Sequence, residues 1–333
     1  MKPVTTYVLG AGASLHAGYP LASALGSTLA RWAERNTPKG HDYRARLAQL
    51  INQYSPLDDF EAIMTELLEC PLGSKASTFP SSERANLIAN IQEAIRECFD
   101  TIRAHPMCLY DRLAQDHIHE GDTIITFNYD LGVERALRSA GHWEIDDGYG
   151  FRIKNTQQSS AVPVLKLHGS TNWRGLLFGG SPGFGVACDS LGSRPVLFFR
   201  PDLEYLGYQE FKDPLCGHLS GVATISALIM PSLNKTFHHQ TTFGNEWEPF
   251  WDHLWQHAKN ALKAADDIVI IGYSLPCADK RARELLLRTT NKTVALTICC
   301  GRTSAAIGEA FRNNKFTNIK TVPTFEDWLA RKK

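Results

Sequence analysis

The stretch Tyr7-Val-Leu-Gly-Ala-Gly-Ala-Ser14 is an aliphatic run that ends abruptly in glycine and other small residues. A buried parallel strand that turns tightly into a helix has this composition, because the strand is covered on both faces and glycine permits the turn. Two later stretches end in the same abrupt way, Ile124-Ile-Thr-Phe-Asn-Tyr-Asp130 and Val164-Leu-Lys-Leu-His-Gly-Ser170. The carboxyl ends of parallel strands line the ligand crevice of open α/β sheets. We therefore predict that the three stretches form one nucleotide site.

Further runs typical of buried strands indicate the fold class. The predicted strands, which mostly do not alternate between apolar and polar residues, are Thr5–Leu9, Thr123–Phe127, Val162–Leu167, Ala227–Met230, Asp267–Ile271 and Val294–Cys299. Such runs favour a parallel sheet. We predict an α/β fold with a Rossmann-like parallel sheet and helices on both faces.

Apolar stripes at helical spacing lie between the first two strands. One stripe contains Phe60, Ile63, Met64, Leu67 and Leu68, and the other contains Leu87, Ile88, Ile91, Ile95 and Phe99. We predict an inserted helical subdomain at residues 37–118, which caps the crevice or offers an interaction surface. Residues 1–36 and 119–333 then form the nucleotide-binding domain.

The segment from Gly169 to about Gly221 changes in composition to Gly, Ser, Pro and aromatic residues. The turn signals within it are Gly179-Gly-Ser-Pro-Gly183 and Arg200-Pro-Asp202. We predict irregular loops and a hairpin there.

Charge and cysteine content exclude several classes of partner. The 333 residues contain 35 Lys plus Arg and 35 Asp plus Glu. The chain therefore lacks the net positive charge that would favour direct binding to nucleic acid. No apolar run approaches the roughly 20 residues that span a bilayer. The eight cysteines lack paired spacing, and no Cys-x-x-Cys occurs. We expect a cytoplasmic protein with no membrane association and no metal.

The first turn offers a phosphate site. At Gly10, Ala11, Gly12 and Ser14 a phosphate can approach bare backbone and the positive end of the following helix. The usual third glycine of a dinucleotide fingerprint is replaced by Leu15, and no acidic ribose-binding residue is clearly placed. A tight turn with no ligand is therefore an alternative interpretation.

Three residues at the next two strand ends could carry chemistry. Asn128 and Asp130 could serve turn formation alone, since Asn and Asp often bond their own backbone. However, they follow a strongly apolar strand and precede a helix-like run, which projects them to the same edge as Gly10. His168 could be a satisfied core histidine, but the Gly169-Ser-Thr-Asn172 stretch that follows favours an accessible imidazole.

A fourth strand end, Ile270-Ile-Gly-Tyr-Ser-Leu-Pro276, completes the predicted site. Gly272 and Ser274 can contact phosphate or ribose hydroxyls. Asp279 could accept a hydrogen bond from a ligand hydroxyl or cap the helix that begins near it, and the sequence leaves both roles open.

Four motifs in one order resemble the sirtuin-like family, in particular a bacterial branch of NAD-consuming effectors in antiphage defence. They are Gly10-Ala-Gly-Ala-Ser14 with Ala17-Gly-Tyr-Pro20, Thr126-Phe-Asn-Tyr-Asp130, Leu167-His-Gly-Ser170, and Gly272-Tyr-Ser-Leu-Pro276 with Asp279. The resemblance implies that the first motif holds the NAD pyrophosphate and that Asn128 and Asp130 lie by the nicotinamide ribose. It implies that His168 is the catalytic histidine and that Gly272 and Ser274 lie on the adenosine side.

Departures from the family pattern favour one activity. Deacylating sirtuins carry Asp-Phe-Arg where this chain has Leu21-Ala22-Ser23, a Gln where it has Phe127, and four zinc cysteines that have no counterpart after His168. The hypothesis is therefore an NAD+ glycohydrolase that yields nicotinamide and ADP-ribose. The alternatives are a sensor that binds NAD or ADP-ribose without turnover, and an NAD-dependent deacylase or ADP-ribosyltransferase.

An unregulated enzyme of this kind would exhaust the NAD of its host. We therefore expect control by homo-oligomerisation, by a separate activating or inhibiting protein chain, or by a small ligand. The sequence does not identify the trigger.

Overall fold

A sheet of six parallel strands lies at the centre of the computed structural model, in which residues 2–36, 60–102, 108–145, 147–151, 161–178, 181–187, 195–199, 205–210, 218–219, 222–232, 248–288 and 291–331 are described. The strands are β1 (Thr5–Leu9), β2 (Thr123–Thr126), β3 (Val164–Lys166), β10 (Asp267–Ile271), β11 (Ala295–Cys299) and β12 (Ile319–Thr321). Their order is β12-β11-β10-β1-β2-β3, and all neighbouring pairs are parallel. The chain thus starts in the middle, builds outwards to β3 and returns to the other side of β1, as in doubly wound dinucleotide-binding folds. The predicted α/β fold is confirmed.

The register of the central strands determines where the site lies. Leu9, the last residue of β1, pairs with Ile271 of β10 on one side and with Thr126 of β2 on the other. The three strands therefore end at the same level. The reversal of strand order between β1 and β10 is the point at which open α/β sheets bind ligands.

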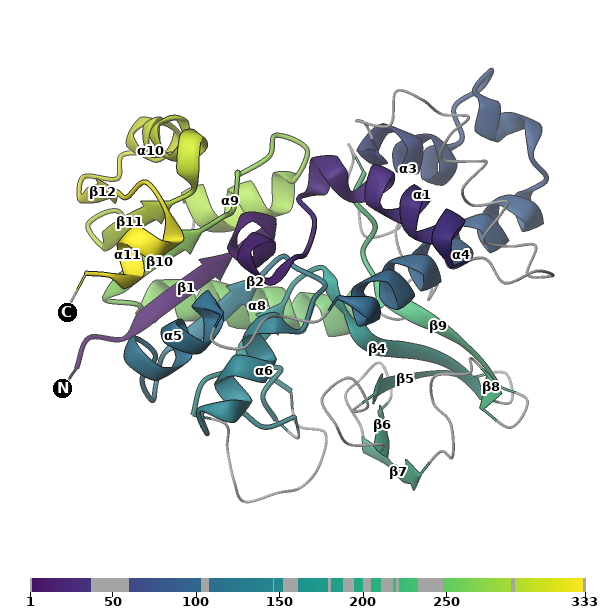
Figure 1. Ribbon diagram of the computed structural model, residues 1–333, viewed down its shortest axis with the longest axis horizontal. Helices are drawn as coiled ribbons and strands as arrows, with labels where there is room; N and C mark the ends of the chain where they lie inside the picture. The colour runs from purple at the N-terminus through teal and green to yellow at the C-terminus, as the bar shows by residue number, and fades with distance from the viewer. Residues whose placement is uncertain are drawn as a thin grey trace.

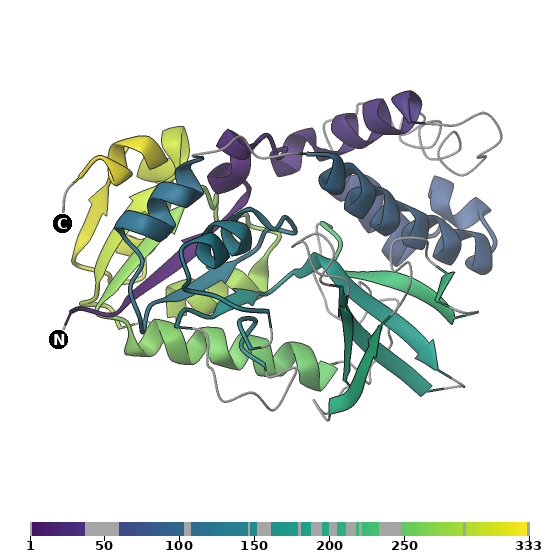
Figure 2. The same cartoon turned by 60° about the horizontal axis from the view of Figure 1, so that its bottom comes forward.

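Helices cover both faces of the parallel sheet (Figures 1 and 2). On one face lie α5 (Leu109–Asp116), α6 (Gly132–Ser139) and α11 (Phe325–Leu329). The opposite face carries α8 (Glu248–Ala264), whose Phe250 and Trp251 are buried in the core of the sheet. Two further helices follow β10 and β11 along the chain, α9 (Lys280–Arg288) and α10 (Ser304–Asn313).

A second hydrophobic core joins three helices, which we call the helical group: α1 (Leu25–Arg35), α3 (Phe60–Glu69) and α4 (Ser81–Thr101). A short 3-10 turn, η3 (Lys75–Thr78), connects α3 and α4. Both predicted apolar stripes face this core, because Phe60, Met64, Ile91 and Ile95 are buried in it. The two predicted helices are therefore confirmed.

The hydrophobic cores do not follow the predicted subdomain limits in every element. Helix α1 precedes residue 37 but packs in the helical group, whereas α5 lies before residue 119 but contributes Tyr110 and Leu113 to the sheet core. Residues 37–59 lie outside the described part of the chain. The division at residues 36 and 119 stays a prediction.

A second, antiparallel sheet lies between β3 and α8 along the chain. Its strands are β4 (Gly169–Phe178), β5 (Ser181–Ala187), β6 (Pro195–Phe199), β7 (Tyr205–Glu210), β8 (His218–Leu219) and β9 (Val222–Leu228), in the order β7-β6-β5-β4-β9-β8. The predicted hairpin is confirmed, since β4 pairs antiparallel with β5. The prediction of irregular loops was wrong for the strand residues, because glycines such as Gly175, Gly183 and Gly185 stand inside strands rather than in turns. The predicted strand at Ala227–Met230 was misplaced as well, since Ala227 and Leu228 end β9 in this antiparallel sheet.

The helical group and the antiparallel sheet both lie beyond the carboxyl ends of the parallel strands, while the two termini lie together at the opposite end (Figure 1). Helix α4 packs against β9, which links the two additions. In the described part of the chain, none of the helices combines the length and hydropathy that a bilayer crossing demands.

Candidate active site

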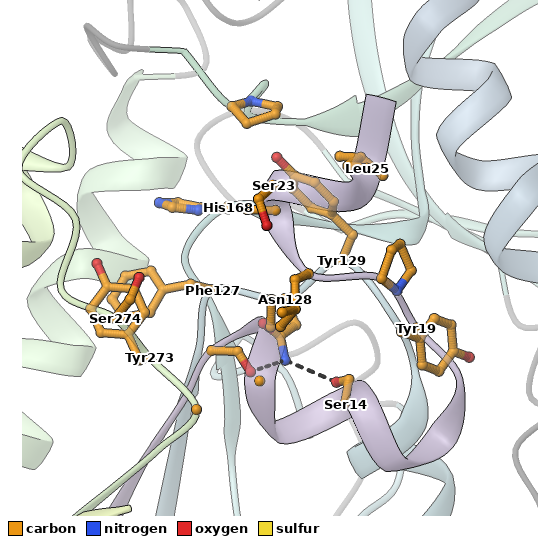
Figure 3. Close-up of a pocket in the computed structure, with 18 of the residues that line it drawn as sticks. Ser14, Tyr19, Ser23, Leu25, Phe127, Asn128, Tyr129, His168, Tyr273 and Ser274 are labelled. Atoms are coloured by element: carbon orange, nitrogen blue, oxygen red, sulfur yellow. Dashed lines mark hydrogen bonds between the residues drawn. The ribbon is translucent and has the colours of Figure 1, made fainter. Parts of the chain in front are cut away.

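A pocket of about 450 Å³ lies where the carboxyl ends of the parallel strands face the helical group (Figure 3). This volume is in the range of small-molecule and cofactor sites. Of the residues predicted from the sequence, Asp279 is not part of the lining. Those that line the pocket are Gly10, Ala11, Gly12, Ser14, Asn128, Asp130, His168, Gly272 and Ser274. Segments more than 250 residues apart in the sequence thus meet at one cavity.

The turns after β1 and β10 pack backbone against backbone and form one wall of this pocket. An added Cβ at Gly10 would lie 2.5 Å from Cα of Tyr273, and one at Gly12 would lie 2.9 Å from Cα of Gly272. The N–H of Gly10 donates to the carbonyl of Ile271 (3.0 Å), and that of Gly12 donates to the carbonyl of Gly272 (2.9 Å). The close approach of the two turns therefore requires glycine at both positions, whether or not a phosphate binds there.

The backbone N–H of Ala11 is not used in the packing of the two turns. This N–H has no backbone partner among the described residues, and the residue is half-buried at the pocket wall. A free N–H at a turn of this kind suits a phosphate oxygen. Ser274 is exposed on the wall that follows β10 (Figure 3). The two turns therefore offer one backbone donor and one hydroxyl to a ligand.

Asn128 lies in the middle of the pocket with its amide nitrogen turned towards the protein (Figure 3). Nδ2 donates to the carbonyl of Gly10 (2.9 Å) and to Oγ of Ser14 (3.0 Å). An amide nitrogen carries two hydrogens, so these bonds use both. The orientation leaves Oδ1 of Asn128 as an acceptor for a ligand.

Ser14 is the centre of a buried hydrogen-bond network behind Asn128. Its hydroxyl donates to Oδ2 of Asp130 (2.7 Å). Because a hydroxyl has one hydrogen, the Tyr110 hydroxyl at 2.7 Å must donate to Ser14. Burial raises the pKa of Tyr110 well above its ordinary value, so this donor keeps its hydrogen at neutral pH. Ser14 therefore supports Asn128 and has no hydrogen left for a phosphate.

Both carboxylate oxygens of Asp130 are engaged by the protein. Oδ2 accepts from Ser14, and Oδ1 accepts from the N–H of Gly132 at the start of α6 (2.9 Å). The backbone carbonyl of Asp130 accepts from Nζ of Lys166. Asp130 thus anchors the end of β2, and its carboxylate acts on the pocket through Ser14.

His168 reaches the pocket directly after β3, among aromatic rings. Its ring centroid lies 5.0 Å from that of Phe127, which stacks on Tyr273 at 4.3 Å and 18°. The chain turns sharply after His168, because Gly169 has φ +84° and an added Cβ would lie 2.0 Å from the carbonyl oxygen of Ala227. The imidazole is therefore held in place but remains part of the pocket lining.

Asp279 lies behind His168. Nε2 of His168 lies 3.1 Å from Oδ2 of Asp279, and the Tyr273 hydroxyl donates to the same oxygen (3.3 Å). Oδ1 accepts from the N–H of Ala282 in the first turn of α9 (3.1 Å). Of the two roles that the sequence left open, the structure shows the helix cap. It adds a contact with His168 that the sequence did not predict.

The helical group contributes pocket residues that sequence reasoning missed. Phe60 and Glu61 of α3 and Phe99 of α4 form the wall that faces the sheet. Their places in or beside apolar stripes predicted burial and carried no sign of a ligand site. Leu21-Ala22-Ser23, where the family pattern has Asp-Phe-Arg, also line the pocket. This wall is therefore apolar apart from one carboxylate and one hydroxyl.

Two acidic groups near the pocket bond protein donors. Asp130 accepts from Ser14 and Gly132, and Asp279 accepts from Ala282 and faces His168. Within the described residues, no group of three or more His, Cys, Asp or Glu side chains is arranged to hold a metal ion.

Comparison with known proteins gives structural likenesses only. No protein-family model matches the chain, and no curated protein matches it. Among solved structures, one from work on the mechanism and regulation of Sir2 enzymes is 13% identical, with a TM-score of 0.39 over 94% of this chain and 93% of that chain. One from work on sirtuin substrate affinity is 12% identical, with a TM-score of 0.38 over 89% and 82%. A Sir2 homologue variant in complex with ADP-ribose is 13% identical, with a TM-score of 0.35 over 94% and 93%.

Proposed function

We propose that this protein is an NAD+ glycohydrolase, which cleaves the bond between nicotinamide and ribose to give nicotinamide and ADP-ribose. The observation that carries the proposal is one pocket in which Asn128 and His168 lie beside the bare-backbone turn at Ala11. The resemblance of the motifs around these residues to the sirtuin-like family supports NAD as the substrate.

The bond to be broken defines the tasks of the pocket. Nicotinamide leaves with the bonding electron pair and becomes neutral, so it needs no strong acid, in contrast to the leaving group of an ordinary glycoside. Positive charge develops on the ribose, and a water molecule must attack C1′ and lose a proton. The site therefore has to position the dinucleotide, order one water and accept one proton.

Asn128 and His168 suit the last two tasks. We assign Oδ1 of Asn128 to accept a hydrogen bond from the attacking water or from a ribose hydroxyl. His168 takes the proton, because an imidazole is the most common general base in enzymes. The family resemblance implies that Asp130 lies by the nicotinamide ribose. We now assign it to hold Ser14, which in turn keeps the amide of Asn128 in its productive orientation.

The remaining pocket residues are assigned to the dinucleotide. The turn of Gly10, Ala11 and Gly12 would contact the pyrophosphate, chiefly through the N–H of Ala11. Gly272 and Ser274 would lie on the adenosine side. The apolar wall from the helical group would exclude bulk water from the reacting bond.

We further propose that the enzyme is a regulated NAD-depleting effector of antiphage defence, which rests on the family resemblance. Its trigger would be self-assembly, a separate activating or inhibiting chain, or a small ligand. Measurement of NAD in infected cells tests this role. We expect NAD to fall in cells with the wild-type protein and to stay constant in cells with Asn128→Ala.

The central prediction is that NAD turnover depends on Asn128 and His168. Purified protein is incubated with NAD, with and without the protein encoded beside its gene, and the products are separated by chromatography. His168→Ala should lower kcat by about 100-fold or more, since a positioned general base contributes about 10²–10⁴. Asn128→Ala should lower kcat by about 100-fold, because loss of the group that positions the reactants costs about that factor. The matched controls Asn313→Ala and His257→Ala change exposed residues outside the pocket and should keep wild-type turnover.

One outcome would contradict the site assignment, and two would contradict the proposed function. Equal turnover by the wild type and both pocket variants would show that the site is wrong. Tight NAD binding without product under every activating condition would favour a sensor. Release of an acyl group from acyl-lysine that requires NAD would favour a deacylase.

A further inference from the structure

His168 and Asp279 form a buried pair behind the pocket wall. Their facing atoms, Nε2 and Oδ2, are 3.1 Å apart, and the two side chains are 8% and 1% exposed. The carboxylate is fixed at both oxygens, since Tyr273 donates to Oδ2 and Ala282 donates to Oδ1. The aromatic contacts of Phe127 fix the plane of the imidazole. The pair is therefore held rigidly by elements on both sides.

The partner of Nε2 determines which ring nitrogen carries the hydrogen. An ionised carboxylate only accepts hydrogen bonds, so this contact favours the tautomer with hydrogen on the nitrogen that faces Asp279. Burial and the charge of Asp279 raise the pKa of Tyr273 well above its ordinary value, so its hydroxyl is also a donor at neutral pH. In a neutral imidazole with its hydrogen on Nε2, Nδ1 is left as the basic nitrogen.

We propose that Asp279 is a positioning residue for the reaction: it holds His168 in the tautomer with hydrogen on Nε2 and so presents Nδ1 to the attacking water. The catalytic part of this inference rests on the proposed function, whereas the pairing itself does not. In the step, the water oxygen bonds to C1′, nicotinamide takes the electron pair of the broken bond, and the water proton moves to Nδ1. The imidazolium that results lies beside the negative charge of Asp279, as in the Ser-His-Asp arrangement.

A helix cap alone does not account for Asp279. Ser and Asn cap helices about as well as Asp, so the cap at Ala282 requires only a short side chain with an acceptor oxygen. Asp additionally provides a second, negatively charged oxygen, and it is this oxygen that faces His168. The two roles can therefore be separated by substitution.

The variants Asp279→Asn and Asp279→Ser separate the helix cap from the contact with His168. In Asp279→Asn the amide oxygen still caps α9, but the amide nitrogen donates to Nε2 and forces the hydrogen onto Nδ1. In Asp279→Ser the cap remains, and nothing replaces the oxygen beside His168. The nitrogen-15 spectrum of the imidazole shows which ring nitrogen is protonated, and the signal of His168 is assigned from its loss in His168→Gln.

We expect hydrogen on Nε2 in the wild type and on Nδ1 in Asp279→Asn. The kcat for NAD should fall by about 10²–10⁴ in Asp279→Asn with little change in KM, because the wrong tautomer blocks proton transfer. The fall in Asp279→Ser should be smaller, and both variants should unfold near the wild-type temperature.

The readouts keep the two proposals apart. Hydrogen on Nδ1 in the wild type would overturn the pairing whether or not the protein hydrolyses NAD, and this measurement needs no Asp279 variant. A changed tautomer in Asp279→Asn with unchanged kcat would overturn the positioning role. If no preparation hydrolyses NAD, the proposed function fails, while the wild-type spectrum still decides the pairing.

Discussion

Ser14 and Asn128 share a hydrogen bond, and that bond decides which atom of each side chain can meet a ligand. Nδ2 of Asn128 donates to Ser14 and Gly10, which leaves Oδ1 without a hydrogen-bond partner among the described residues. Ser14 gives its only hydrogen to Asp130, so its hydroxyl is closed to a phosphate. The set of residues that can touch NAD is therefore smaller than the set of residues in the motifs.

Gly272 and Gly301 offer a matched test of backbone contact at the residue scale. Both have positive φ, +64° and +59°, which a residue with a Cβ adopts at a cost of about 1–2 kcal/mol. An added Cβ at Gly272 would lie 2.0 Å from the nitrogen of Ala13, whereas at Gly301 it meets no atom within 4 Å. Gly272→Ala should therefore lower the free energy of unfolding by about 1–3 kcal/mol more than Gly301→Ala.

Urea denaturation of the two variants measures this difference. Equal losses of stability would mean that the two turns do not pack as closely as the structure shows. Activity provides a second readout, since only Gly272→Ala should also disturb the pocket wall.

The sequence predicted which residues gather at the candidate site better than it predicted the contacts between them. Asn128 and His168 could be found because each ends a strongly apolar strand, and the register of parallel strands brings such ends together. The contact between His168 and Asp279 could not be found, because it joins residues 111 positions apart through the packing of Phe127 and Tyr273. Spacing along the chain contains no information about such a contact.

At the scale of elements, strand β3 and helix α6 are joined by a buried ion pair beneath the pocket. Nζ of Lys166 lies 2.8 Å from Oε1 of Glu134, and both side chains are fully buried. Lys166 also donates to the carbonyl of Asp130, which ties the pair to the end of β2. Burial raises the pKa of Glu134, and Lys166 opposes that effect. The pair therefore holds three elements in register below Asn128.

We predict that Lys166→Met destabilises the protein by about 3–5 kcal/mol at pH 8, because it leaves Glu134 as an unpaired buried charge. The folded state binds a proton at Glu134 more tightly than the unfolded chain does, whose glutamate pKa is about 4.3. The stability from this protonation is fully present below the unfolded pKa and is lost as the pH rises through the folded pKa. The variant should therefore be closer to the wild type at pH 5 than at pH 8.

The double variant Lys166→Met with Glu134→Leu is the control for this prediction. It removes both charges and should recover most of the lost stability, since a buried pair is often replaced by apolar residues at little cost. Urea denaturation at both pH values measures the effect. A loss that does not change with pH would contradict the proposed role of Glu134.

The strands differ in how well their residue pattern predicts them. Strands β1, β2, β3, β10 and β11 are buried runs and were predicted, whereas β12 is an edge strand whose Lys320 and Thr321 are exposed. An edge strand needs no apolar run, so its pattern is too weak to identify. In the antiparallel sheet, glycines inside the strands obscured the alternation of apolar and polar residues that identifies a strand. These strands are defined by their pairing with β4, and the sequence pattern does not show that pairing.

At the scale of the whole molecule, the pocket lies between two hydrophobic cores. The sheet core contributes the turns after β1, β2 and β10, while the helical group contributes the wall with Phe60 and Phe99. The two cores are separate clusters, so we expect local opening of the helical group without unfolding of the sheet. A ligand that touches both walls would resist that opening.

We predict that ADP-ribose, the proposed product, protects both cores from amide hydrogen exchange. At about 100 times its Kd, a ligand stabilises the state that binds it by about 2.7 kcal/mol, which slows exchange about 100-fold. Ile91 of α4 and Ile270 of β10 are buried reporters of the two cores. In Phe99→Ala, which removes part of the helical wall, protection should decrease at Ile91 more than at Ile270. Protection of Ile270 with no change at Ile91 in the wild type would show that the ligand touches the sheet alone, and the helical group would then have no part in binding.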